Sequence, residues 1–61
     1  MSPEPVRVVI VDDHPVVRDG LRGMLEGDEG LAVVGEAGGG DEAVGLIARL
    51  SPHVVLMDLR M

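Results

Sequence analysis

The fold is decided by residues 6–15, which read VRVVIVDDHP. An apolar run rich in β-branched valine and isoleucine meets two adjacent acids, Asp12 and Asp13. A strand that is buried on both faces of a parallel sheet has this pattern, so we expect a strand over residues 6–12. Pro15 suits the first position of a helix, with Asp13 or His14 as its N-cap.

The helix that begins at Pro15 is expected to continue until the break at residues 28–30, which read DEG. Its apolar residues recur at the spacing of an amphipathic helix, and they are Val17, Leu21, Met24 and Leu25. Met24 is interpreted as a flexible core filler, as is Met57 further along the chain.

The remaining residues predict a strand, a helix and a strand. Residues 31–37 have the composition of a second strand, residues 38–40 are a glycine loop, and Asp41 is a good N-cap. The second helix stops at Ser51-Pro52, because the residue before a proline avoids the helical region. Residues 53–58 complete a third strand. The apolar stripe of the second helix comprises Ala43, Ile47 and Leu50, widened by Val44 and Leu46.

The order β-α-β-α-β with short connections predicts an α/β fold with a parallel sheet and right-handed crossovers. Three strands and two helices make only part of a doubly wound sheet. We therefore expect residues 1–5 to be a loose lead and residues 6–61 to be roughly the first half of one domain.

The composition argues against several classes of function. The 61 residues carry a formal net charge of −6, which argues against a nucleic-acid-binding surface in this segment. Cysteine is absent, so neither a disulfide nor a thiolate metal site can form. No apolar run approaches the roughly 20 residues that span a bilayer, and the N-terminus lacks the features of a signal peptide. We expect a cytoplasmic protein without membrane contact.

Three acids follow two of the predicted strands: Asp12 and Asp13 after the first, and Asp58 at the end of the third. The carboxyl ends of parallel strands meet at one edge, where open α/β sheets bind their ligands. Carboxylates so close together repel one another unless a cation lies between them, and Mg²⁺ prefers oxygen ligands. A helix cap at Asp13 and a polar strand end at Asp58 are the simpler interpretations of each acid taken alone.

Residues 8–21 (VVIVDDHPVVRDGL), 34–38 (VGEAG) and 52–61 (PHVVLMDLRM) together resemble the receiver domain of two-component response regulators. Within that family the DDHP run followed by VRDGL is most similar to the NarL-like subfamily, which has a LuxR-type output domain. The resemblance implies a flavodoxin-like receiver fold with strand order 2-1-3. It also implies that residues 6–61 are the N-terminal half of that domain, truncated after the third strand.

The resemblance assigns a role to each acid. Asp58 matches the phosphoacceptor and is the reacting, catalytic carboxylate. Asp13 matches the acid that binds Mg²⁺ directly, Asp12 acts on the metal through water, and the backbone carbonyl of Arg60 is the third protein ligand. The implied partner is a sensor histidine kinase, and DNA is contacted only through a downstream output domain. The chain would accept a phosphoryl group and regulate transcription, and it would not be an enzyme.

The chain also departs from the family pattern. Receiver domains need a serine or threonine after the fourth strand and a lysine after the fifth, whereas this sequence has five arginines, no lysine and no aromatic residue. We therefore expect residues 1–61 alone to be incompetent in phosphotransfer.

Three other functions remain open. A partial domain would expose sheet or helix surface through which it could self-associate as an oligomerising structural fragment. Residues 38–43 satisfy the dinucleotide-binding pattern G-x-G-x-x-A, although Asp41 and Glu42 would repel a pyrophosphate. The third alternative is an aspartate-dependent phosphohydrolase. Its usual signature has a second acid two residues after the nucleophile, whereas Asp58 is followed by Leu59 and Arg60. His14 is expected to be a solvent-facing turn residue and His53 a structural one.

Overall fold

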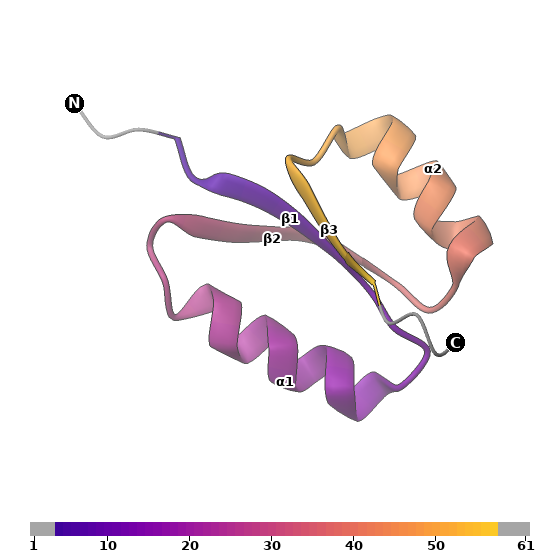
Figure 1. Cartoon of the computed structure of the whole chain (residues 1–61), viewed down its shortest axis with the longest axis horizontal. Helices are drawn as coiled ribbons and strands as arrows, with labels where there is room; N and C mark the ends of the chain where they lie inside the picture. The colour runs from indigo at the N-terminus through magenta and orange to yellow at the C-terminus, as the bar shows by residue number, and fades with distance from the viewer. Residues whose placement is uncertain (1–3, 58–61) are drawn as a thin grey trace.

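The structure is a computed structural model that describes residues 4–57. It contains β1 (Val6–Val11), α1 (Pro15–Glu26), β2 (Leu31–Ala37), α2 (Gly40–Leu50) and β3 (Val54–Met57). The strands form one parallel sheet in the order β2-β1-β3, and the two helices lie on opposite sides of it (Figure 1). The predicted α/β fold and the strand order 2-1-3 are therefore confirmed. Neither helix of the described segment has the length and apolarity that a bilayer span requires.

β1 is the centre of the sheet because it pairs with β2 on one side and β3 on the other. Its residues 8–11 are buried, with Val9 and Ile10 at 0% exposure. Since side chains alternate along a strand, β1 contributes apolar groups to both faces of the sheet. On the face toward α2, the core consists of Val9, Val11, Ala37 and Ala43, with Val34, Leu46, Leu50 and Val55 packed against it.

Strand β2 combines a register shift against β1 with a close approach of α2 at Gly35. Val8 is paired with Val33 and Val9 with Gly35, so one residue of β2 is skipped between them. A Cβ atom at Gly35 would lie 2.9 Å from Leu50 Cδ1, which is closer than carbon atoms normally approach. A Cβ atom here would therefore displace the Leu50 methyl group, so glycine suits the packing of α2 against the bulged strand.

Arg7 joins the C-terminus of α2 to the start of the sheet. Its guanidinium donates hydrogen bonds to the carbonyls of Leu50 and Ser51 over 3.2 and 2.8 Å. A cation at this position also complements the negative end of the helix dipole. The Arg7 backbone N–H donates to His53 Nδ1 over 2.9 Å, and the His53 N–H donates back to the Arg7 carbonyl. The expected structural role of His53 is thus observed.

The apolar faces of the two helices are less buried than the spacing of their apolar residues predicts. Met24 is 77% exposed and Met57 is 45% exposed, so the interpretation of both as core fillers is wrong. Val17, Val44 and Ile47 also remain exposed. Helical periodicity shows which residues share a face, but the described residues include too little packed structure to cover the whole of either face.

Three predicted ends also differ from the structure. β3 begins at Val54 rather than at residue 53. β1 ends at Val11 rather than at residue 12. Helix α2 begins at Gly40 with Gly39 as its N-cap residue, so Asp41 is in the first turn and not the cap. An acid in the first turn still interacts favourably with the helix dipole. The sequence at the start of α2 therefore resembles one in which Asp41 is the N-cap residue.

Substitution at Gly35 tests this close approach. We expect Gly35→Ala to lower the free energy of unfolding by about 1 kcal/mol, because the added methyl group overpacks against Leu50. Gly45→Ala is the matched control, because Gly45 lies in α2 and a Cβ atom added there would meet nothing within 4 Å. We expect that change to raise stability by roughly 0.5–1 kcal/mol through helix propensity. Urea unfolding measures both, and a Gly35→Ala variant as stable as the wild type would contradict the packing argument.

Candidate functional site

The site is formed where β1 ends and the chain turns into α1. Asp12 follows the last residue of β1 and is only 2% exposed. Among the described residues, it is the only charged one that is buried. Its backbone N–H donates to the carbonyl of Ala37, the last residue of β2, over 3.0 Å. The carboxylate is therefore held at the C-terminal edge of the sheet, as the sequence predicts.

Three adjacent side chains converge at this edge. His14 Nδ1 lies 3.0 Å from Asp12 Oδ1 and 2.8 Å from Asp13 Oδ1. One ligand atom from each of these residues fits within a cluster whose atoms are all within 4.8 Å of one another. Asp12 and Asp13 therefore lie together, as expected. The His14 side chain is 64% exposed, but its ring contacts both acids and is more than a solvent-facing turn residue.

Hydrogen bonds from His14 favour the charged form of Asp12. The backbone N–H of His14 donates to Asp12 Oδ1 over 2.8 Å and lowers the pKa of the carboxyl below its ordinary value of 3.8. Burial acts in the opposite direction. The side-chain hydrogen bond to the His14 ring and the positive charges of His14 and Arg18 lower the pKa further. Asp12 is thus an anion at neutral pH.

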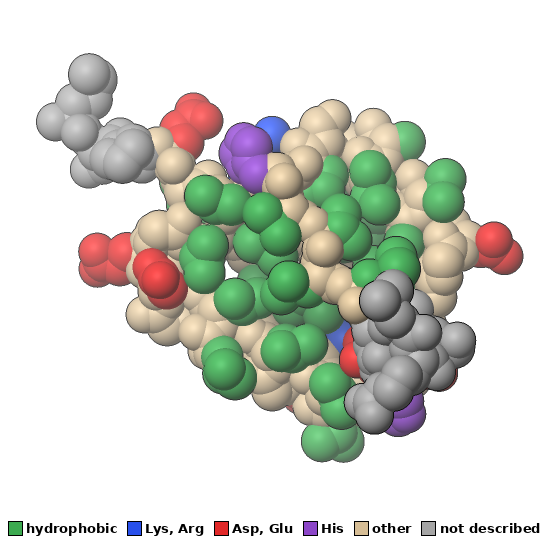
Figure 2. Space-filling model, viewed as in Figure 1, with side chains coloured by type: hydrophobic (Ala, Val, Ile, Leu, Met, Phe, Trp, Pro, Cys, Tyr) green, Lys and Arg blue, Asp and Glu red, His purple; other side chains and the backbone are tan. Residues whose placement is uncertain are grey.

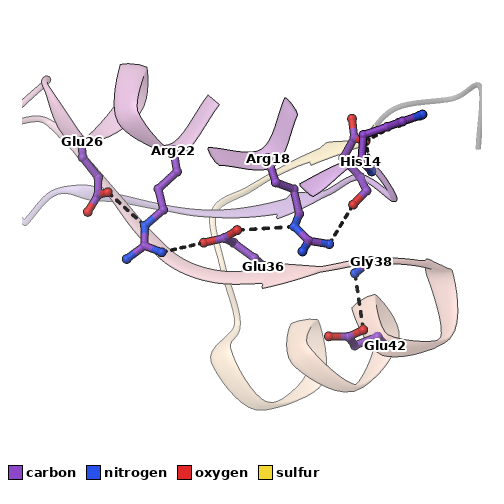
Figure 3. Close-up of polar contacts among 8 residues, drawn as sticks. His14, Arg18, Arg22, Glu26, Glu36, Gly38 and Glu42 are labelled. Carbon is purple, nitrogen blue, oxygen red and sulfur yellow. Dashed lines mark hydrogen bonds and ion pairs between the residues drawn. The ribbon is translucent and has the colours of Figure 1, made fainter. Parts of the chain in front are cut away.

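Arg18 of α1 connects the site to the second strand (Figure 3). Its Nη1 donates to the backbone carbonyl of Asp12 over 3.0 Å, and its Nε lies 3.5 Å from Glu36 Oε1. The Nε atom is buried and has no hydrogen-bond partner within the described residues, so the ion pair with Glu36 is its compensating interaction. Arg18 therefore fixes the position at which the chain leaves β1.

The same glutamate also binds the next turn of α1. Arg22 Nη1 lies 2.9 Å from Glu36 Oε2, and Arg22 Nε lies 3.0 Å from Glu26 Oε1. The hydrogen bond to Glu26, followed by the charges of Glu26 and Glu36, raises the pKa of Arg22 above its ordinary value. Glu36 thus holds two arginines of one helix face. It was not predicted as a site residue; its only sequence signal is an acid near the end of an apolar strand.

The glycine loop before α2 offers no anion site of the dinucleotide-binding kind. Glu42 Oε2 accepts a hydrogen bond from the Gly38 N–H over 3.4 Å, and Asp41 also lies in the first turn of α2. Two carboxylates therefore occupy the helix end that would receive a pyrophosphate, which repels such a ligand. The geometry agrees with the charge argument from the sequence.

Two of the predicted site residues, Asp58 and Arg60, lie outside the described residues. Their nearest described neighbour in sequence is Met57, whose register partner in β1 is Val11. Val11 is in turn the residue before Asp12. Strands β1 and β3 are thus in register up to the edge of the sheet where Asp12 and Asp13 lie.

Several curated proteins with sequences similar to this chain are regulators. The nitrate/nitrite response regulator protein NarP of Escherichia coli is 53% identical over 57 residues, which are 93% of this chain and 26% of NarP. The transcriptional regulatory protein LiaR of Bacillus subtilis is 50% identical and is covered to the same 26%. A protein-glutamate methylesterase/protein-glutamine glutaminase of Geobacter metallireducens is 54% identical, but only 16% of it is covered. The chain spans about a quarter of the first two relatives.

The fold also matches part of a solved structure. The structure of RcsB from Salmonella enterica serovar Typhimurium, bound to promoter rprA in the presence of the phosphomimetic BeF₃⁻, superposes with a TM-score of 0.89 at 38% sequence identity. The match covers 95% of this chain and 29% of the RcsB chain. The arrangement β2-β1-β3 with a helix on each side is therefore that of the corresponding part of RcsB.

The lowered pKa of Asp12 can be measured directly. In metal-free buffer, we expect the pKa of the Asp12 carboxyl to lie below 3.8. The pH dependence of its carbon NMR signal measures this pKa. Because the pKa falls on folding, this group contributes stability that is complete above pH 3.8 and is lost as the pH drops through the folded pKa. Titration at or above 3.8 would show that burial outweighs the His14 hydrogen bonds.

The family model described as the response regulator receiver domain matches residues 8–61, nearly the whole chain. The acidic edge, the strand order and the relatives agree with that match. This chain belongs to the response regulator receiver domain family.

Proposed function

We propose that residues 6–61 form the N-terminal half of a receiver in which Asp58 accepts a phosphoryl group from a sensor histidine kinase. Asp13 binds the required Mg²⁺ directly, Asp12 acts through water, and the backbone carbonyl of Arg60 completes the protein ligands. The response would pass to DNA through an output domain downstream of this chain. In this role the chain receives a group once per signal and is not an enzyme.

The observation that carries the proposal is the parallel pairing of β1 with β3. Val11 and Met57 are register partners, and each is followed in sequence by an aspartate. Parallel strands end at the same edge, so this register supports a shared pocket for Asp12 and Asp58. The buried, ionised Asp12 is an unfavourable charge unless a cation or donor groups compensate it.

The donor chemistry of the described residues fits a divalent cation. Asp12 and Asp13 supply two carboxylates, the ligand type that Mg²⁺ prefers alongside retained water. When bound, Mg²⁺ would neutralise these carboxylates and the oxygens of the incoming phosphoryl group. The protein's own contribution is positional: Ala37 and His14 hold Asp12 through backbone hydrogen bonds, and Arg18 holds its carbonyl.

Relatives support the wider role. NarP and LiaR are described as a response regulator and a transcriptional regulatory protein, and RcsB was solved on a promoter. The enzymatic name of the Geobacter relative does not extend to this chain, which covers only 16% of that protein. A transcriptional output is therefore the function that the relatives favour.

The phosphoacceptor role predicts binding of beryllofluoride, a mimic of the phosphoryl group, in the presence of Mg²⁺. We expect the full-length gene product carrying these residues to bind it, and the 61-residue chain to bind little or none, because the sequence lacks the lysine that stabilises the phosphoryl group. Fluorine NMR measures both.

Asp58→Asn in the full-length product should abolish this binding, since the acceptor carboxylate is replaced by a neutral amide. Asp19→Asn is the matched control, because Asp19 is an exposed carboxylate on α1. Equal binding by the Asp58→Asn variant would remove Asp58 from the role.

A second candidate function is self-association. Val54, Leu56 and Met57 of β3 are 41%, 36% and 45% exposed, and hydrophobic side chains cover much of the face shown in Figure 2. Within the described residues, β3 pairs only with β1, so one of its edges carries unpaired backbone groups. We propose that the isolated 61-residue chain associates with a second copy through β3.

Sedimentation distinguishes this candidate from a simple monomer. We expect the isolated chain to be oligomeric at micromolar concentration, and Leu56→Lys to shift it toward the monomer by placing charge on the exposed strand. Val16→Lys, on the exposed face of α1, is the control and should leave the association unchanged. A monomer that unfolds cooperatively would contradict self-association.

A further inference from the structure

Arg18 holds the end of β1 from outside the acidic cluster. Its Nη1 donates to the backbone carbonyl of Asp12 over 3.0 Å, and the two residues are six positions apart in sequence. The side chain of Asp12 is the buried carboxylate at this edge. Because carbonyl and carboxylate belong to one residue, the direction of the carboxylate depends on where the Arg18 guanidinium lies.

The end of β2 holds that guanidinium in turn (Figure 3). Arg18 Nε lies 3.5 Å from Glu36 Oε1, and both side chains are 24% exposed. The Nε atom is buried and has no hydrogen-bond partner among residues 4–57, so the charge of Glu36 compensates it. A Cβ atom at Gly38 would lie 3.2 Å from Arg18 Nη1, so the chain after β2 leaves little free space beside the guanidinium.

Loss of the Glu36 charge would remove the reason for Arg18 to stay in this position. A buried guanidinium N–H without a compensating partner is costly, so the side chain would turn toward solvent and release the Asp12 carbonyl. Arg22 has a different role. It binds the other oxygen of Glu36 over 2.9 Å and is also paired with Glu26. The Arg22 side chain is 51% exposed, and water can replace these partners.

We propose that Glu36 is a positioning residue of the acidic edge, and that it acts through Arg18 to hold Asp12 in place. The proposal adds no ligand to the site. Its effect on Mg²⁺ binding rests on the proposed function, in which Asp12 acts on the metal through water. The hold on Asp12 itself needs no metal and can be tested without one.

The metal-free test follows the amide hydrogen exchange of the full-length gene product. The backbone N–H of His14 donates to Asp12 Oδ1 and reports the position of that carboxylate. We expect Glu36→Gln to speed exchange at this amide about tenfold, as loss of one hydrogen bond would. Arg22→Gln is the matched control, because it removes the other ion pair of Glu36 and retains the one with Arg18. Exchange at His14 should stay nearly unchanged in that variant.

The second measurement is Mg²⁺ affinity by calorimetry on the same proteins. We expect Glu36→Gln and Arg18→Gln each to weaken binding about tenfold, as loss of a group that orients a metal site does. The double variant should bind no more weakly than Arg18→Gln, because both substitutions remove the same link. A general loss of stability does not produce this non-additivity, and thermal unfolding of each variant measures stability separately.

The outcomes separate this inference from the proposed function. Unchanged exchange at the His14 amide in Glu36→Gln would overturn the positioning role, whatever the metal affinity. Equal effects of Glu36→Gln and Arg22→Gln, or additive effects of Glu36→Gln and Arg18→Gln, would overturn it as well. If the wild type bound no Mg²⁺ while the His14 amide responded as expected, the proposed function would be wrong and the role of Glu36 would stand.

Discussion

The structure depends on the burial of β1 between two neighbouring strands. A strand with partners on both sides and helices on both faces must be apolar throughout, and residues 8–11 meet that requirement with four branched aliphatic side chains. The chain becomes charged at Asp12, one residue after the strand ends. The boundary between the apolar strand and the acids is therefore also the boundary between core and site.

A charge that lies so close to the core needs compensation, and the chain supplies it locally. Backbone and ring hydrogen bonds from His14 favour the ionised carboxylate, and Arg18 adds a positive charge beside it. Arg18 is itself paired with Glu36, which also binds Arg22. Helix α1, strand β2 and the acidic edge are thus linked by ion pairs through Glu36 and by the hydrogen bond from Arg18 to the Asp12 carbonyl (Figure 3).

Much of the fold was predictable because the periodic signals are local. The β-branched run at residues 6–11, the strand at 31–37 and the stop at Ser51-Pro52 each depend on adjacent residues, and all three agree with the structure. The helical faces were less predictable. Met24 and Val44 have core-like spacing but remain exposed, since burial depends on which distant segments cover a face. The Arg18–Glu36 pair was missed for the same reason: its partners are 18 positions apart in sequence.

The sequence by itself determined the element order, the parallel sheet and the two acids at the end of β1, because these follow from local patterns and from the rule that parallel strands end at a common edge. Only the tertiary structure decided the environment of those acids. The register shift at Gly35, the ion pairs of Glu36 and the contact of His14 with both carboxylates arise from the packing of segments against one another. Their strength depends on distance and burial in three dimensions, which spacing along the chain does not specify.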